Sequence, residues 1–116
     1  MNWSAIGAVA LALAVMFGAF GAHSLRGRLD EYSLGVYEKA VFYHFIHAIG
    51  LLVVPLLLKD GGSRVCWLLL AGILIFSGSL YALAITGIRT LGAITPIGGL
   101  AFIAAWILLA WDLRSR

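Results

Sequence analysis

Charged residues divide this sequence into long stretches that contain none. Four uncharged runs are present, at residues 1–25, 40–58, 65–88 and 90–111. An α-helix needs ~20 residues to cross the ~30 Å hydrocarbon core of a bilayer, and every run is close to or above that length. Because backbone amides in lipid must be paired within their own segment, runs this long and continuous predict helices. We therefore expect an all-α fold, an integral membrane bundle of four transmembrane helices.

The composition agrees with lipid as the solvent for most of the surface. Hydrophobic residues make up 63% of the chain and charged residues 11%, whereas a soluble domain carries about 25% charged residues to cover its surface. The net charge of +3 comes from a few Lys and Arg residues that lie between the apolar runs. This distribution suits contact with anionic headgroups and argues against a nucleic-acid-binding face. The single Cys66 cannot form an internal disulfide and is expected to serve packing.

The charged breaks between the runs indicate how the helices are connected within one domain, 1–116. Spans are expected at about 3–25, 38–58, 64–87 and 91–112. Short polar breaks follow the second and third spans, so helices 2 to 4 should form antiparallel hairpins. The first connection is longer, and apolar residues recur in it at helical spacing: Leu25, Leu29, Tyr32 and Val36. This pattern predicts a short interfacial amphipathic segment between helices 1 and 2. The alternative is an amphipathic extension of helix 2.

The apolar runs indicate a multi-pass protein of the inner (cytoplasmic) membrane. No Lys or Arg precedes the first run, which is also longer than a usual signal-peptide core, so we expect this segment to be retained. The positive-inside rule gives a tie, because each side of the membrane collects four basic residues. These are Lys59, Arg64, Arg114 and Arg116 on the side of the termini, and Arg26, Arg28, Lys39 and Arg89 on the other. The first span has basic residues only after it, which favours termini outside.

Small residues recur at four-residue intervals in the first, third and fourth spans, in the fourth at Ala101 and Ala105. The candidate helix-packing positions are Ala10, Ala14, Gly18 and Ala22 in the first span, and Gly78 and Ala82 in the third. Such a stripe lets a neighbouring backbone approach closely, and in lipid this van der Waals contact drives helix association. The run of four predicts that helix 1 lies at the centre of the bundle. The alternative is that Ala and Gly are simply common in membrane helices.

Polar residues inside the spans are few, and no carboxylate lies deep in the membrane. Proton-coupled transporters use such carboxylates, so this pattern argues against a small multidrug antiporter, which depends on a glutamate in its first helix. The remaining polar residues form a candidate network: His23, Glu38, Tyr43, His44, His47, Ser77, Ser79 and Tyr81.

His23 and His44 are expected at similar depth, because helix 1 ends and helix 2 begins on the same side of the membrane, and His47 is expected one turn deeper, so the three could converge. His44 and His47 also share one helical face. Three interpretations stay open: hydrogen bonding between helices, a metal or cofactor site, and proton conduction. Hydrogen bonding is the commonest of these roles for a histidine in a bundle. The hydroxyl of Tyr81 needs a partner as well, and a histidine of helix 2 is a candidate.

The fourth run contains a second candidate site at its start, formed by Thr95, Pro96, Gly98 and Gly99. Thr95 is a suitable N-cap and Pro96 a suitable first helical residue, so a regular helix is expected to begin there. Residues 91–94 would then run irregularly at membrane depth. The free amides of the helix N-terminus would make an anion or headgroup site. The alternative is one continuous helix with a kink at Pro96.

Several segments in combination resemble a known family of small membrane proteins. They are Gly18-Ala19-Phe20-Gly21-Ala22-His23, Glu38 with Tyr43 and His47-Ala48, Phe76-Ser77-Gly78-Ser79-Leu80-Tyr81, and Leu91-Gly92-Ala93-Ile94-Thr95-Pro96-Ile97-Gly98-Gly99. The chain is similar to the family called domain of unknown function 423, which includes transmembrane protein 256. The resemblance implies a four-span membrane protein without an established activity. It also implies that glutamine often replaces His44, which weakens a metal site at His44 and His47 because glutamine is a poor ligand for transition metals.

We expect a non-enzymatic membrane protein that acts by association with membrane lipids or with a membrane protein, a second copy of the chain included. No nucleophile with its base, no paired acids and no phosphate-binding loop can be assembled from the sequence. No metal, cofactor or nucleic-acid partner is expected. The alternative function is binding or transport of a small molecule or ion between the start of helix 4 and His23, His44 and His47.

Overall fold

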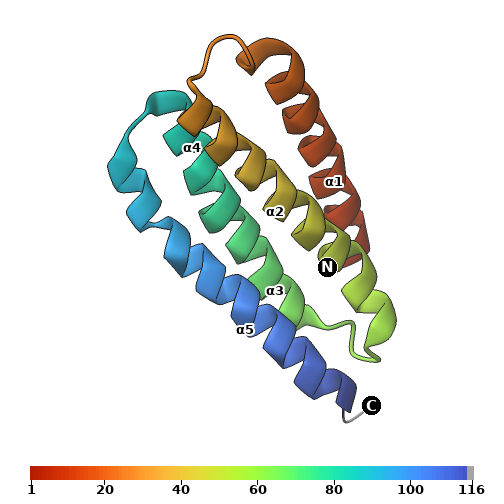
Figure 1. Cartoon of the computed structure of the whole chain (residues 1–116). Coiled ribbons are helices and arrows are strands. Elements are labelled where there is room, and N and C mark those ends of the chain that lie inside the picture. Colours follow the sequence, from red (N-terminus) through yellow and green to blue (C-terminus); the bar gives the residue numbers. More distant parts are fainter. Residues whose placement is uncertain (115–116) are drawn as a thin grey trace.

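The computed structural model describes residues 1–114, which form helices joined by short connections (Figure 1). Four helical segments are long and apolar enough to cross a membrane: Trp3–Leu25, Glu31–Leu57, Ser63–Thr86 and Arg89–Arg114. The described residues contain no strand, so the predicted all-α bundle of four membrane-spanning helices is confirmed. The long axis measures 48 Å, close to the ~40–45 Å of a bilayer with its headgroups. Arg116, counted above for the orientation, lies outside the described residues.

Three of the four segments contain a turn that is not α-helical. The first segment is α1 (Trp3–Phe20) followed by a π-helical turn, η1 (Gly21–Leu25), and the second is α2 (Glu31–Leu57). The third consists of α3 (Ser63–Gly72), a π-helical turn, η2 (Ile73–Ser77), and α4 (Gly78–Thr86). The fourth consists of a 3₁₀ turn, η3 (Arg89–Ala93), and α5 (Thr95–Arg114).

α2 lies at the centre of the bundle, and α1 lies at its edge. In Figure 1, α1 flanks α2 on one side, whereas α3, α4 and α5 lie on the other. α2 packs against α1, α3, η2 and α4, whereas α1 packs mainly against α2. The prediction that helix 1 forms the centre is therefore wrong. A stripe of small residues allows a close approach to one neighbour, and it does not determine how many neighbours a helix has.

Gly7, near the start of α1, lies in close contact with the backbone of α2. A Cβ at this position would lie 2.5 Å from a backbone nitrogen of α2, so only glycine allows the two backbones to approach this closely. Ala10 and Ala14 continue the contact and are buried. Gly18 is half-buried and Ala22 is exposed. The two helices therefore separate toward η1.

α5 makes a comparable close contact with η2 through Gly98. A Cβ on Gly98 would lie 2.7 Å from Cβ and 2.8 Å from Cα of Phe76. The packing positions expected in the third segment, Gly78 and Ala82, are half-buried. A Cβ on Gly78 would meet no atom within 4 Å outside its own helix backbone. Gly98, and not Gly78, is thus one of the positions where the third and fourth segments pack closely.

The connection between the first two spans is short, because α2 begins at Glu31. Asp30 caps this helix: its carboxylate accepts a hydrogen bond of 2.7 Å from the Ser33 amide, which holds the pKa of Asp30 below its ordinary value. α2 then runs without a break to Leu57. The amphipathic residues 31–39 are therefore the first turns of α2, the second of the two alternatives stated above, and not a separate helix.

The fourth span is interrupted where the sequence indicated. The 3₁₀ turn η3 ends at Ala93, and the regular helix α5 begins at Thr95. Pro96 is thus in the first turn of α5, where its missing N–H costs no intrahelical hydrogen bond. The expected start of a regular helix at this point is confirmed, and the span is not one continuous kinked helix.

Candidate functional site

His44 connects the central helix to α4. Its side chain is buried, and its Nδ1 shares a hydrogen bond of 2.8 Å with the Tyr81 hydroxyl. The ring of Phe17 from α1 lies beside both residues, at centroid distances of 6.2 Å from His44 and 4.9 Å from Tyr81. Inside a membrane protein such a pair holds two helices together, because leaving either partner unbonded costs free energy.

His47 connects the central helix to α5 and uses both ring nitrogens. Its Nδ1 lies 2.7 Å from the carbonyl oxygen of Tyr43, and the Trp106 indole N–H donates to its Nε2 over 3.0 Å. Because a carbonyl can only accept, the proton is on Nδ1 and Nε2 accepts. The ring also stacks on Phe102 at a centroid distance of 3.4 Å. His47 is therefore a neutral imidazole, and a metal or an added proton would have to displace the Trp106 hydrogen bond.

His23 and Glu38 do not join the buried histidines. His23 is exposed in η1, and Glu38 is exposed near the start of α2. Within residues 1–114, His23 makes no hydrogen bond or ring contact with His44 or His47. In the same range, no group of three or more His, Cys, Asp or Glu side chains is arranged to hold a metal ion. The structure thus divides the candidate network into separate local links.

The hydroxyl groups inside the bundle also link helices. Ser77 of η2 is fully buried and donates to the Ala40 carbonyl over 2.8 Å. The hydroxyls of Ser79 and Thr95 lie 2.6 Å apart and join α4 to α5. Two further bonds join α1 to α2, from Ser4 to the Leu52 carbonyl and from Tyr37 to the Phe17 carbonyl. Every buried side-chain nitrogen and oxygen in residues 1–114 has a partner. The polar groups at depth are therefore used within the protein.

The second candidate site, at the start of α5, is in contact with neighbouring helices. Gly98 is buried against Phe76, and a Cβ on Gly99 would also lie 3.8 Å from the Phe76 ring. The Thr95 hydroxyl is bonded to a serine hydroxyl of α4, and Pro96 is exposed. The first turn of α5 therefore serves the contact with η2 and α4.

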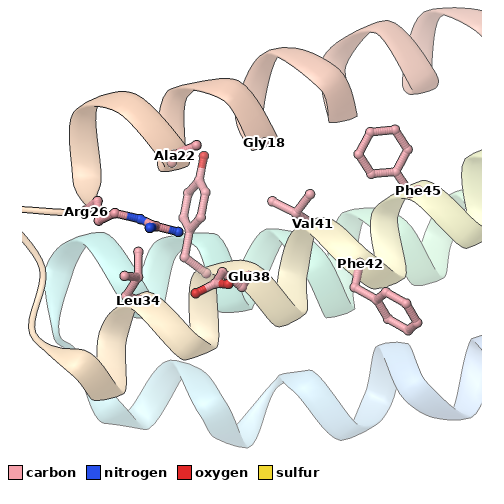
Figure 2. Close-up of a pocket in the computed structure, with 10 residues that line it drawn as sticks. Gly18, Ala22, Arg26, Leu34, Glu38, Val41, Phe42 and Phe45 are labelled. Atoms are coloured by element: carbon pink, nitrogen blue, oxygen red, sulfur yellow. The ribbon is translucent and has the colours of Figure 1, made fainter.

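A groove of about 320 Å³ lies between the first segment and the first half of α2 (Figure 2). Its lining residues are Gly18, Gly21, Ala22, Arg26, Leu34, Tyr37, Glu38, Val41, Phe42 and Phe45. In Figure 2, Arg26 and Glu38 lie toward one end, and the rings of Phe42 and Phe45 lie toward the other. The volume is at the lower end of the ~300–1,000 Å³ typical of ligand sites. The groove thus has a charged end and an apolar end.

Small residues of the first segment leave the groove open, and Tyr37 of α2 supports its wall. A Cβ on Gly18 would still lie 3.5 Å from the nearest side chain, and Ala22 adds only a methyl group. Gly21 faces the Tyr37 ring, where a Cβ would come within 2.5 Å. The Tyr37 hydroxyl donates to the Phe17 carbonyl over 2.5 Å, next to the widened turn η1. Such π-helical turns are rare in proteins and frequent at functional sites.

We expect the charged end of the groove near the level of lipid headgroups, from the lengths of the helices. Arg26 directly follows the first span, which ends at Leu25. α2 has 27 residues, and at ~1.5 Å per residue it measures ~40 Å, longer than the ~30 Å hydrocarbon core. Glu38 is the eighth residue of α2, so it is expected close to the boundary between headgroups and hydrocarbon on the same side. Both side chains are exposed, and among the described residues they make no ion pair with each other.

The sequence gives little indication of the groove. The sequence predicts other roles for three of its residues, helix packing for Gly18 and Ala22 and the polar network for Glu38. Arg26 and the aromatic lining residues are not among the predicted site residues. Trp106 is also missing from the predicted network. A signal for Trp106 exists, because an indole in the middle of a span, away from the interfacial belts, needs an acceptor within the bundle.

Comparison with known proteins identifies the family of this chain. A family model described as "Protein of unknown function (DUF423)" matches residues 17–99. The chain belongs to the DUF423 family. The resemblance found in the sequence is thereby confirmed. The matched range includes every groove residue and the start of α5, so both candidate sites lie in the part of the chain that matches DUF423.

Relatives of this DUF423 protein are named as membrane proteins. The chain is 50% identical over 109 residues to the UPF0382 membrane protein YwdK of Bacillus subtilis, and the match covers 90% of this chain and 89% of the relative. It is 49% identical over 107 residues to a UPF0382 membrane protein of Staphylococcus haemolyticus, covering 90% and 88%. No solved structure matches the chain. These names and the four apolar helices together support a membrane protein.

Proposed function

We propose that this DUF423 protein is a non-enzymatic protein of the cytoplasmic membrane that holds a phospholipid in the groove between the first segment and α2. The observation that carries the proposal is the groove itself, with Arg26 and Glu38 near headgroup level and an apolar remainder. A phospholipid has the same division between a polar headgroup and apolar chains. Phe42, which lines the groove, is 60% exposed, so the groove is accessible from the surrounding lipid.

The apolar part of the groove is shaped to hold one acyl chain. Gly18 and Ala22 lie on one side, and Val41 and Phe45 lie on the other. Within a membrane, lipid tails are as apolar as the helix surface, so binding depends on van der Waals contact rather than on the hydrophobic effect. A concave slot makes more such contacts with a chain than the convex outer surface of a helix does.

The histidines support a structural role rather than ion binding or transport. Both nitrogens of His47 are hydrogen-bonded within the protein, and His44 is bonded to Tyr81. His23, which would have completed a cluster, is exposed in η1. The polar groups therefore stabilise the bundle that supports the groove.

Filling the groove should release the lipid. Ala22→Phe places a large ring in the groove from an exposed position, so the fold is expected to tolerate it. Native mass spectrometry of the protein extracted gently from membranes should show one retained phospholipid for the wild type. We expect Ala22→Phe to weaken lipid binding about tenfold, equivalent to ~1.4 kcal/mol of binding free energy, and so to lower the retained fraction.

The matched control is Ala19→Phe, which adds the same ring at an exposed position that does not line the groove. This variant should retain lipid as the wild type does, and both variants should melt at similar temperatures. The proposal fails if the wild type carries no phospholipid, or if Ala22→Phe retains it as well as Ala19→Phe does.

A further inference from the structure

The groove carries two opposite charges that the protein leaves without an internal counter-ion. Arg26 follows η1 and Glu38 belongs to α2, and both line the same end of the groove. The ion pair found within residues 1–114 joins Arg64 to Asp112 at 3.3 Å, in another part of the bundle. A guanidinium and a carboxylate thus face one site without bonding to each other, and both are available to a ligand.

The other polar groups near the groove do not compete for the same ligand. The Tyr37 hydroxyl is bonded to the Phe17 carbonyl. His23, Arg28 and Lys39 are exposed and do not line the groove. The charges that a headgroup would meet are therefore one positive and one negative.

Phospholipid headgroups differ in how well they match such a pair. A guanidinium binds the oxygens of a phosphate through a planar set of N–H donors. A carboxylate is an acceptor only, so it needs a donor such as a primary ammonium group. A phosphocholine headgroup has no N–H to donate. An anionic phosphoglycerol headgroup offers Glu38 only neutral hydroxyl donors, which form weaker hydrogen bonds with a carboxylate than a charged ammonium group does.

We propose that the groove selects a zwitterionic phospholipid whose headgroup ends in a primary ammonium group, as in phosphatidylethanolamine. This inference rests on the proposed lipid-binding function. Arg26 binds its phosphate, and Glu38 accepts hydrogen bonds from its ammonium group. One acyl chain lies against Val41 and Phe45. Charge complementarity between the headgroup and the Arg26–Glu38 pair gives the selectivity, and the apolar part of the groove gives affinity common to all phospholipids.

The selectivity can be measured on delipidated full-length protein in detergent by native mass spectrometry. The probes are phosphatidylethanolamine, phosphatidylcholine and phosphatidylglycerol with identical acyl chains. We expect the wild type to bind phosphatidylethanolamine about tenfold more tightly than the other two, as expected for one charge-assisted hydrogen bond. Glu38→Gln should remove this preference. Arg26→Gln should weaken binding of all three lipids.

Reversing the charge at position 38 distinguishes headgroup recognition from a purely structural role of Glu38. Glu38→Lys should reverse the preference, so that phosphatidylglycerol binds most tightly. The matched controls are Glu31→Gln and Arg28→Gln, which change the same charges at exposed positions outside the groove. Both controls should leave the preference for phosphatidylethanolamine unchanged.

The failure of this inference differs from the failure of the proposed function. If the wild type binds all three lipids equally and Ala22→Phe abolishes the binding, the headgroup assignment is overturned and the lipid-binding function stands. If Glu38→Lys leaves the order of affinities unchanged, the headgroup assignment is overturned as well. If the wild type binds none of the three lipids, both proposals are overturned.

Discussion

Replacing Gly98 with alanine is expected to destabilise the bundle by ~1–3 kcal/mol, the usual cost of overpacking a close contact. The added Cβ would lie 2.7 Å from Cβ and 2.8 Å from Cα of Phe76. These atoms belong to the backbone region of η2 and cannot rotate away, so α5 must move as a whole. The measurement is the thermal unfolding midpoint in detergent, followed by circular dichroism or by loss of soluble protein.

The control for this prediction is Gly78→Ala in α4. A Cβ on Gly78 would meet no atom within 4 Å outside its own helix backbone, and alanine is favoured over glycine in a helix by roughly 0.5–1 kcal/mol. Gly78→Ala should therefore melt at or above the wild-type temperature. A Gly98→Ala protein that melts with the wild type would show that α5 and η2 do not approach as closely as described.

Replacing His47 with alanine should destabilise the protein by ~1–3 kcal/mol, because the Trp106 indole N–H loses its acceptor. The same change removes the ring that stacks on Phe102 at 3.4 Å. The measurement is again the unfolding midpoint in detergent. His23→Ala should leave that midpoint unchanged, because His23 is exposed and makes no contact with the buried histidines.

The hydrogen bond itself can be separated from the loss of ring volume by a double-mutant cycle. Trp106→Phe removes the indole donor and keeps an aromatic ring, so the combination of His47→Ala with Trp106→Phe should cost less than the sum of the two single changes. Strict additivity, or an equal effect of His23→Ala, would rule out a stabilising link between His47 and Trp106.

The architecture could be predicted because it depends on a strong physical constraint. Each charged break in the sequence marks a place where the chain leaves the hydrocarbon, and the lengths of the intervening runs determine the helix count. Thr95 and Pro96 also predicted the start of α5, because threonine and proline are common at the N-termini of helices. These signals act within a few residues along the chain.

The arrangement of the helices depends on contacts between distant residues, which local patterns do not determine. Ala10, Ala14, Gly18 and Ala22 form a regular stripe in the sequence, yet the glycine of α1 that lies against the α2 backbone is Gly7, outside the stripe. The π-helical turn η1 moves the helix out of regular register after Phe20, so residues beyond it no longer follow the spacing of the stripe. Ala22 is consequently exposed in the groove rather than packed on α2.

The candidate site residues are of two kinds, polar residues inside the spans and charged residues next to them. His44, His47 and Tyr81 stand out in the sequence because polar groups are rare in lipid, and the structure shows them bonded between helices. Arg26 does not stand out, because charged residues are ordinary next to a membrane span, and Glu38 is predicted to join the histidines and not a groove. Their significance comes from facing the same groove, which depends on the packing of η1 against α2.

The most direct test of lipid binding in the groove is the position at which a photoreactive phospholipid attaches to the protein in a bilayer. A phosphatidylethanolamine with a diazirine in one acyl chain is mixed into vesicles, irradiated, and mapped by peptide mass spectrometry. We expect attachment to concentrate on Val41, Phe42 and Phe45, and to fall in Ala22→Phe but not in Ala19→Phe. Attachment spread equally over exposed α5 residues, such as Leu100, Ile103 and Ile107, would contradict the presence of a lipid site in the groove.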